Sequence, residues 1–230
     1  MHTVKRAIIM AAGLGSRMRP ITDTVPKPMV RVKGVRMIDT VIDALHENGI
    51  REIHIVVGHL RERFEELYEK YPDIHLIYNP YYKTCNNISS LYAAREYLED
   101  VIILDGDQII YNSDIVRPQF ERSGYNAVWT EETTEEWLLS VKDGIITGCS
   151  RTGGRGGWQL YSISRWSRAD GARLRGHLEY EFEEKRNTGI YWDDVAMFCH
   201  SGEYRLGIME MKKEDIVEID SIEELEQLNK

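Results

Sequence analysis

A glycine-bearing loop with three basic side chains follows the first apolar run of the chain. Residues 11–28 read Ala-Ala-Gly-Leu-Gly-Ser-Arg-Met-Arg-Pro-Ile-Thr-Asp-Thr-Val-Pro-Lys-Pro. Glycines at such a place let backbone N–H groups approach an anion closely. Arginine and lysine side chains add the positive charge that phosphate groups attract. The loop therefore predicts triphosphate binding by Gly13, Gly15, Arg17, Arg19 and Lys27.

Two common phosphate-binding motifs are absent from this loop. The chain has no Gly-x-x-x-x-Gly-Lys-Ser/Thr sequence, and Met18 stands where a dinucleotide fingerprint has its third glycine. The loop is therefore expected to bind a nucleotide in a manner different from P-loop and dinucleotide-binding proteins.

Two carboxylates follow the fourth apolar run. Asp105 and Asp107 come directly after Val101–Leu104, which places them at the carboxyl edge of a parallel sheet, where open α/β folds bind ligands. A triphosphate needs Mg²⁺ to neutralise its charge, and Mg²⁺ accepts one or two carboxylates while it keeps water ligands. Asp107 is therefore predicted to be a Mg²⁺ ligand, with Asp105 next to the nucleotide.

The C-terminal region offers a second carboxylate. Strand alternation places Glu218 and Asp220 on one face, and Ser221 with Glu224 matches a capping box at the start of a helix over Ile222–Leu228. From these residues alone, Asp220 is either a metal ligand or a helix-start residue favoured by the helix dipole.

Two further clusters combine aromatic and acidic residues, at 135–138 and 189–194. A quaternary ammonium offers no hydrogen-bond donor, so proteins hold it with aromatic faces and a nearby carboxylate. The clusters predict such a cage, made of Trp137, Tyr191, Trp192 and Asp194. The alternative is that these aromatic side chains belong to the core.

These residues need a sheet and helices to position them, and the apolar pattern predicts a βαβ arrangement. Apolar strand runs are expected at 4–10, 53–57, 74–78 and 101–104, and amphipathic segments at 37–48, 61–70, 90–98 and 114–121. Gly49 is expected to end the first helix. Shorter strands over 127–163, with a turn at Asp143-Gly144, predict an antiparallel excursion. The glycine-rich stretch 152–157 is interpreted as a mobile loop or hairpin tip.

Length and composition fit one α/β domain over residues 1–230, with 42% hydrophobic residues. The net charge of −9 argues against nucleic acid as a partner. No stretch approaches the roughly 20 apolar residues of a membrane span, and no apolar leader precedes the first strand, so a cytoplasmic location without membrane insertion is expected. Cys85, Cys149 and Cys199 are widely spaced, which argues for reduced thiols.

The stretch from Gly13 to Pro28 resembles the signature of nucleotidyltransferases that activate sugar, polyol and aminoalcohol phosphates. The ending Ile219-Asp220-Ser221-x-Glu-Glu-Leu resembles the C-terminal motif of the same family. This resemblance implies a Rossmann-like, GT-A-like domain with a mixed, mostly parallel sheet, and it implies that Asp220 shares Mg²⁺ with Asp107. It further implies nucleotide contacts from Ala12, Gly13, Gly15, Ser16, Asn87, Ser89 and Asp105, although Asn87 and Ser89 also suit a helix cap.

Taken over its whole length, with the Trp137 and Tyr191 clusters included, the chain resembles bacterial CTP:phosphocholine cytidylyltransferases, which supply activated choline for cell-surface decoration. The resemblance implies CTP and phosphocholine as substrates and CDP-choline and pyrophosphate as products. It implies that Arg17 holds the β- and γ-phosphates and that Lys27 bridges the α-phosphate and the incoming phosphate. The glycine-rich stretch 152–157 and the arginine-rich segment 165–175 depart from that family's pattern.

Three alternatives stay open at the level of sequence. A sugar-1-phosphate nucleotidyltransferase using UTP or dTTP would share the loop and the metal but not the cage. A nucleotide-sugar glycosyltransferase would share the Asp105-Gly-Asp107 motif but lacks the Pro26-Lys27-Pro28 loop. A regulatory module would bind nucleotide without chemistry. The sequence leaves the oligomeric state open, a homodimer included.

Overall fold

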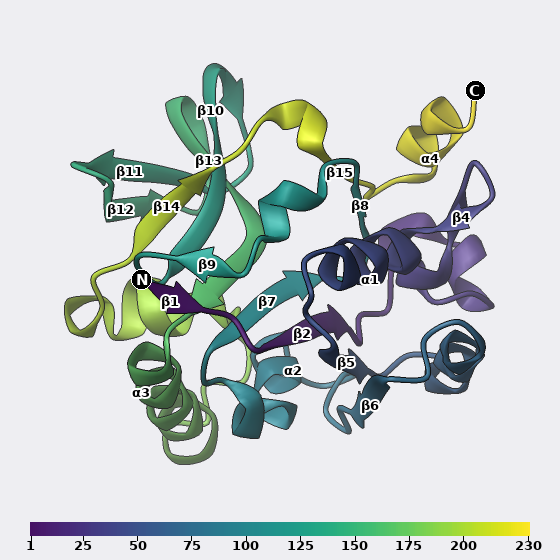
Figure 1. The fold of residues 1–230 in the computed structure, drawn as a ribbon, viewed down its shortest axis with the longest axis horizontal. Coiled ribbons are helices and arrows are strands. Elements are labelled where there is room, and N and C mark those ends of the chain that lie inside the picture. Colours follow the sequence, from purple (N-terminus) through teal and green to yellow (C-terminus); the bar gives the residue numbers. More distant parts are fainter.

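A mixed nine-stranded sheet forms the centre of the computed structural model, which describes residues 1–230 (Figure 1). Its strands lie in the order β10-β14-β12-β11-β13-β7-β2-β5-β6, and β10 also pairs with β13. Their bounds are β2 Arg6–Ala11, β5 Glu52–Val57, β6 Ile74–Tyr78, β7 Val101–Asp105, β10 Gly124–Thr134, β11 Leu138–Lys142, β12 Ile145–Ser150, β13 Gly154–Trp166 and β14 Gly207–Glu210.

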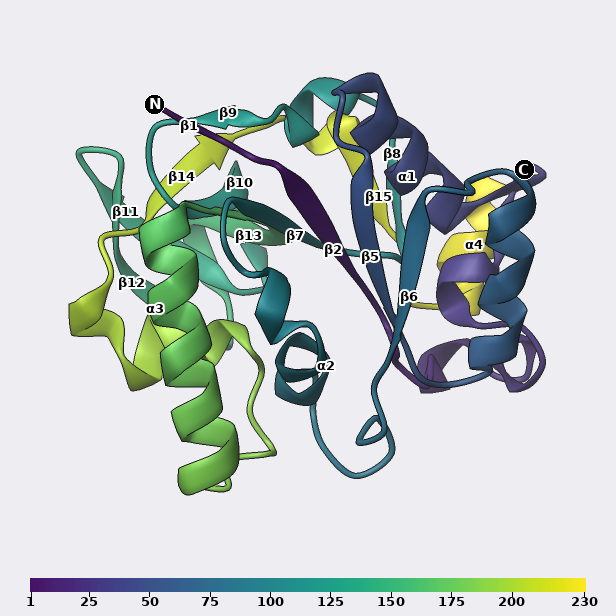
Figure 2. The ribbon, with the colours of Figure 1, turned by 60° about the horizontal axis from the view of Figure 1, so that its bottom comes forward.

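The four strands β7, β2, β5 and β6 run parallel to one another. They are apolar runs because both faces of this half of the sheet are covered. Ala7 and Ile9 of β2 pack with helix α1 (Met37–Glu47) in one hydrophobic core. Ile8 and Met10 pack with α2 (Ile88–Ala93) and α3 (Arg168–Glu179) in a second core, on the opposite face (Figure 2).

The helices follow the sequence prediction in part. Helix α1 ends as expected before Gly49, whose φ of 75° is left-handed. The segment 61–70 is a 3₁₀ helix over Arg61–Glu69, and the segment 90–98 divides into α2 and a short 3₁₀ turn over Arg95–Tyr97.

The amphipathic helix expected over 114–121 is wrong. A 3₁₀ turn over Ser113–Val116 is followed by the short strand β9 (Gln119–Phe120), which pairs with β1 (His2–Thr3). Pro118 lies between these two elements, where its missing N–H and its ring prevent a helix from continuing. The Pro118 carbonyl instead accepts a hydrogen bond from the Val4 N–H, at 2.8 Å.

The other half of the sheet holds β10–β13, which pair antiparallel, and β14, which runs parallel to β10. It is larger than the small excursion expected, and β13 joins it to β7 in antiparallel register. The β11–β12 hairpin turns at Asp143 and Gly144, which have φ values of 52° and 72°. Positive φ at both central residues is typical of the tight hairpin turn predicted here.

Two small pairs of strands complete the fold. The first pairs β3 (Arg31–Val32) with β4 (Val35–Arg36). The second pairs β15 (Ile216–Glu218) with β8 (Gln108–Ile110), and Glu218 faces Gln108 in this pair. Because β8 directly follows the Asp105-Gly-Asp107 turn, this pairing brings the C-terminal carboxylates to the edge of β7. Helix α4 (Ile222–Leu228) then begins with the predicted capping box of Ser221 and Glu224. No helix combines the length and the apolar character needed to cross a membrane.

Candidate active site

The glycine-bearing loop leaves the carboxyl end of β2 and folds back onto the Lys27 segment. Gly15 has φ 62°, and a Cβ atom there would lie 2.8 Å from Thr22 Cγ2 and 3.2 Å from Lys27 Cβ. The Gly15 carbonyl accepts hydrogen bonds from the Met18 N–H (2.9 Å) and from the Thr22 hydroxyl (2.8 Å). Gly15 is therefore needed both for its left-handed backbone and for the close approach of the two segments.

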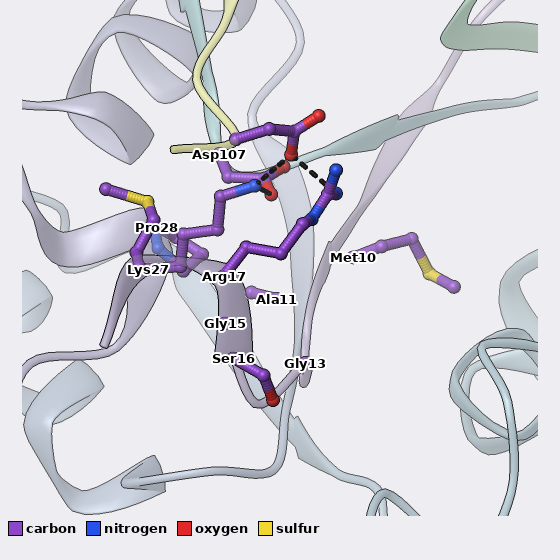
Figure 3. Close-up of a pocket in the computed structure, with 11 residues that line it drawn as sticks. Met10, Ala11, Gly13, Gly15, Ser16, Arg17, Lys27, Pro28 and Asp107 are labelled. Carbon is purple, nitrogen blue, oxygen red and sulfur yellow. Dashed lines mark hydrogen bonds and ion pairs between the residues drawn. The ribbon is translucent and has the colours of Figure 1, made fainter. Parts of the chain in front are cut away.

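Lys27 lies between two carboxylates that come from distant parts of the chain. Its Nζ is 2.6 Å from Asp107 Oδ2 and 2.7 Å from Asp220 Oδ1, and Arg17 Nη2 is 2.8 Å from the same Asp220 oxygen. Figure 3 shows the Lys27 side chain beside Asp107, with the Arg17 side chain extending to the same side of the Gly13–Ser16 turn. Burial opposes the charge on Lys27, but the two carboxylates outweigh it and raise the pKa of the ammonium.

Asp107 and Asp220 are suited to share a divalent cation as well. They already bind one cation, Lys27 Nζ, from two sides, so their oxygens converge. No group of three or more His, Cys, Asp or Glu side chains is placed to hold a metal ion. A metal bound here would therefore complete its coordination with phosphate oxygens and water, which is how Mg²⁺ commonly binds beside nucleotides.

The side chain of Asp220 does not cap the following helix. Its backbone N–H, like that of Ser221, donates to Glu224 Oε2, while Ser221 Oγ accepts from the Glu224 N–H. The Asp220 carboxylate is directed to Lys27 and Arg17 instead. The Asp220 carboxylate therefore lies with the basic side chains of the loop rather than in the helix cap.

Two adjoining cavities meet at these charged residues. The first, of about 290 Å³, is lined by the glycine-bearing loop, with Gly13, Gly15 and Ser16 among its residues. The second, of about 270 Å³, is lined by aromatic and acidic side chains. Both cavities are lined by Arg17, Lys27, Asp107 and Asp220. This arrangement suits a reaction between two ligands whose reacting groups meet at the shared charges.

The second cavity contains Trp137 and Tyr191, whose rings lie edge to face with centroids 5.7 Å apart. Glu136, Asp193 and Glu218 also line it. Burial raises the pKa of Asp193 to about 7, and burial likewise raises the pKa of Glu218 to about 7. A ligand cation in this cavity would offset the negative charge of these carboxylates and so favour their ionised form.

Two of the four predicted cage residues lie elsewhere. Trp192 is a core residue, only 3% exposed, and its ring packs 6.0 Å from Tyr125 and 6.2 Å from Trp166. Asp194 is also 3% exposed, and Arg151 on the β12–β13 turn pairs with it. In the segment that carries Asp193 and Asp194, successive side chains point in different directions, so Asp193 rather than Asp194 lines the cavity.

The other nucleotide-site predictions divide between the two cavities and the core. Asn87 and Asp105 line the second cavity rather than the first. Asn87 Oδ1 also accepts a hydrogen bond from the Trp192 N–H, at 2.9 Å. Burial, and then the nearby charges of Asp107 and Glu218, raise the pKa of Asp105 well above its usual value.

Three residues with predicted nucleotide contacts do not line either cavity. Ser89 is 1% exposed and its hydroxyl donates to the Asn86 carbonyl, because it packs at the start of α2. Ala12 is 4% exposed, since the chain beyond β5 packs against its carbonyl. Arg19 forms an ion pair with Asp23, one turn further on, at 3.3 Å.

Comparison with known proteins gives consistent matches over nearly the whole chain. A family model described as the MobA-like NTP transferase domain matches residues 7–169. The chain is 39% identical to the 2-aminoethylphosphonate cytidylyltransferase of Lancefieldella rimae, over 95% of this chain and 89% of that protein. It is 32% identical to the choline-phosphate cytidylyltransferase of Streptococcus pneumoniae, over 97% and 96% of the two chains. A solved structure of CTP:phosphocholine cytidylyltransferase from Streptococcus pneumoniae matches with a TM-score of 0.91 and covers 99% of this chain and 98% of that one.

Proposed function

The chain belongs to the MobA-like NTP transferase family, and from this premise we propose that it transfers the cytidylyl group of CTP to phosphocholine, giving CDP-choline and pyrophosphate. The single observation that carries this proposal is the meeting of two cavities at Arg17, Lys27, Asp107 and Asp220. One cavity has the glycine-bearing loop suited to a triphosphate. The other has aromatic rings and carboxylates suited to a cation.

The proposed reaction is an in-line displacement at the α-phosphorus of CTP. An oxygen of the acceptor phosphate forms a bond to this phosphorus, and the bond between it and the bridging oxygen of the β-phosphate breaks, so that pyrophosphate leaves with the electron pair. A phosphate monoester is already ionised near neutral pH, so no general base is needed. No side-chain nucleophile is needed either.

The side chains contribute position and charge. We propose that the Lys27 ammonium contacts the α-phosphate and the incoming phosphate, because it lies where the two cavities join. Arg17, with its side chain 73% exposed beside the loop, would hold the β- and γ-phosphates. The attraction between these two cations and the phosphates is strongest when negative charge grows on the transferring phosphoryl group. Fixed charges accelerate such reactions by stabilising that charge.

Members of this nucleotidyltransferase family generally use a divalent metal, and we propose Mg²⁺ held by Asp107 and Asp220. When bound, Mg²⁺ supplies charge neutralisation on the phosphate oxygens. The two carboxylates suit it because they are oxygen ligands that already converge on one cation.

A second candidate acceptor is 2-aminoethylphosphonate, the substrate named for the relative that is 39% identical. Its primary ammonium has N–H donors, which a trimethylammonium lacks. Besides the two proposed metal ligands, the second cavity is lined by four carboxylates that could accept from these donors, but by only two aromatic side chains; the four are Asp105, Glu136, Asp193 and Glu218. A cavity with more carboxylates than aromatic rings suits the small, well hydrated ammonium of 2-aminoethylphosphonate better than the aromatic cage predicted from sequence would.

Pyrophosphate release separates these acceptors. The purified protein with Mg²⁺ would be assayed with each of four nucleoside triphosphates against phosphocholine, 2-aminoethylphosphonate, phosphoethanolamine and several sugar 1-phosphates. We expect turnover with CTP and phosphocholine. Faster turnover of 2-aminoethylphosphonate would establish the second candidate. Turnover of a sugar 1-phosphate with UTP or dTTP, and none with CTP, would contradict both.

Alanine substitution distinguishes cavity aromatics from core aromatics. We expect Trp137→Ala and Tyr191→Ala each to raise the KM for phosphocholine by about 2- to 30-fold, because a cation–π contact contributes about 0.5–2 kcal/mol. The KM for CTP should change little. Trp192→Ala should instead destabilise the fold, by about 3–5 kcal/mol, since it empties part of the core. Steady-state kinetics and thermal unfolding of the three variants test this, and equal loss of stability in all three would place every aromatic in the core.

A further inference from the structure

Two aromatic walls of the second cavity come from separate parts of the chain, and Arg151 contacts both parts. Trp137 precedes β11, whereas Tyr191 and Phe198 lie in the segment between α3 and β14. The Arg151 guanidinium carbon is 3.9 Å from the Phe198 ring centroid and 5.8 Å from the Trp137 ring centroid. The Trp137 ring in turn meets Phe198 edge to face, at 5.8 Å.

Arg151 also forms an ion pair with a buried carboxylate behind the Tyr191 wall. Its Nη2 is 2.5 Å from Asp194 Oδ1, and Asp194 is only 3% exposed. The other oxygen of Asp194 accepts a hydrogen bond from the Tyr191 N–H, at 3.0 Å. The guanidinium is thus linked through one carboxylate to the backbone of Tyr191. Because the partner is buried, this pair is coupled more strongly than a surface ion pair.

The glycine-rich turn allows Arg151 to reach this position. A Cβ atom on Gly153 would lie 1.8 Å from the Thr134 carbonyl oxygen, and one on Gly157 would lie 2.8 Å from Leu138 Cγ. The turn is therefore packed against the segment that carries Trp137. In addition to this packing, the Leu160 N–H of β13 donates to the Trp137 carbonyl, at 2.8 Å. The glycines have a positional role here, because larger residues would push Arg151 and Trp137 apart.

We propose that Arg151 is a positioning residue for the acceptor: it ties the Trp137 wall to the Tyr191 wall and so sets the spacing between them. Because Arg151 pairs with Asp194, the neighbouring carboxylate Asp193 is the one that lines the cavity. The inference rests on the proposed function for the identity of the acceptor, but the contacts that define Arg151 do not depend on it.

The kinetic test uses Arg151→Met, Asp194→Asn, the double variant and the control Arg155→Met. Methionine keeps an unbranched apolar chain without the charge. Arg155 lies four residues further on, at the start of β13, and its Nε donates to the carbonyl of the exposed residue Glu131, at 3.4 Å. We expect Arg151→Met to raise the acceptor KM about tenfold, equivalent to about 1.4 kcal/mol, with the CTP KM and kcat within about twofold of wild type. Arg151→Lys should restore part of the loss.

The double variant tests the pairing itself. If Arg151 acts through Asp194, the acceptor KM of the double variant should be no higher than that of the worse single variant. The proposal would be overturned if Arg151→Met and Arg155→Met have the same acceptor KM. It would also be overturned if Arg151→Met raises the KM for the acceptor and the KM for CTP equally. If the wild type prefers another acceptor, the proposed function fails, and the same ratios are then measured with that acceptor.

A crystal structure of Arg151→Met gives a readout that needs no acceptor. We expect the Trp137 ring to leave its edge-to-face contact with Tyr191, which is 5.7 Å between centroids in the wild-type chain. A variant that folds and keeps this contact unchanged would overturn the inference, whatever the acceptor is. Asp194→Asn, which removes the charge that pairs with Arg151, serves in the same comparison if the methionine variant does not fold.

Discussion

Replacing Lys27 with alanine is expected to lower turnover by about 10²- to 10³-fold, because one fixed positive group at a developing phosphoryl charge typically contributes about 3–4 kcal/mol. CTP binding should weaken much less, since Arg17 and the glycine-bearing loop remain. The neighbouring carboxylates raise the pKa of Lys27, so its ammonium stays charged as the pH rises above neutral. Steady-state kinetics of pyrophosphate release, together with CTP binding by calorimetry, measure the two effects separately.

Two further variants make this result specific. Arg19→Ala changes a cation in the same loop that pairs with Asp23 and lines neither cavity, so it should leave turnover close to wild type. Arg17→Ala should weaken CTP binding as well as turnover. A Lys27→Ala enzyme with near-native turnover would remove this lysine from the mechanism.

The place of the glycine-bearing loop at the first cavity could be predicted from the sequence because the residues involved are close together in the chain. Gly13, Gly15, Arg17 and Lys27 lie within one short stretch after a buried strand, and the backbone there dictates where they point. The position of Asp107 could be predicted for a similar reason, because the carboxyl end of a parallel strand is a fixed place in the fold. Asp220 needed more than local information, since only the β8–β15 pairing brings it beside Lys27.

The lining of the second cavity could be predicted only in part, because long-range packing decides which side chains face it. Trp192 and Tyr191 are neighbours of the same aromatic character, and the sequence does not show which one packs on Tyr125 and which one faces the cavity. The same holds for Asp193 and Asp194. Arg151 had no signal at all, because an arginine beside glycines in a turn is common and its partner is 43 residues away in the sequence.

The fold shows the same division between local and long-range signals. Strands buried on both faces give continuous apolar runs, and all four predicted parallel strands are present. The helix expected over 114–121 does not form, because Pro118 ends the helical segment after the 3₁₀ turn over Ser113–Val116.

Asp107→Asn and Asp220→Asn are each expected to raise the Mg²⁺ concentration needed for half-maximal activity by at least about tenfold, since changes to residues that only support metal ligands already cost about 10- to 100-fold in affinity. Each substitution removes one formal negative charge where the two carboxylates converge. Removal of the metal with EDTA should abolish pyrophosphate release in the wild type. Titration of activity with Mg²⁺ at saturating CTP measures the shift.

The helix that follows Asp220 provides the control for this result. Ser221 Oγ accepts from the Glu224 N–H at 3.2 Å, so Ser221→Ala should lower the stability of the fold by about 1 kcal/mol and leave the Mg²⁺ requirement unchanged. Asp220→Asn should do the opposite, because its side chain bonds Lys27 and Arg17 rather than the helix N-terminus. If Asp220→Asn changes thermal stability alone, as Ser221→Ala does, then Asp220 supports the helix and the second metal ligand must be another carboxylate of the shared cavities, with Glu218 the nearest in sequence.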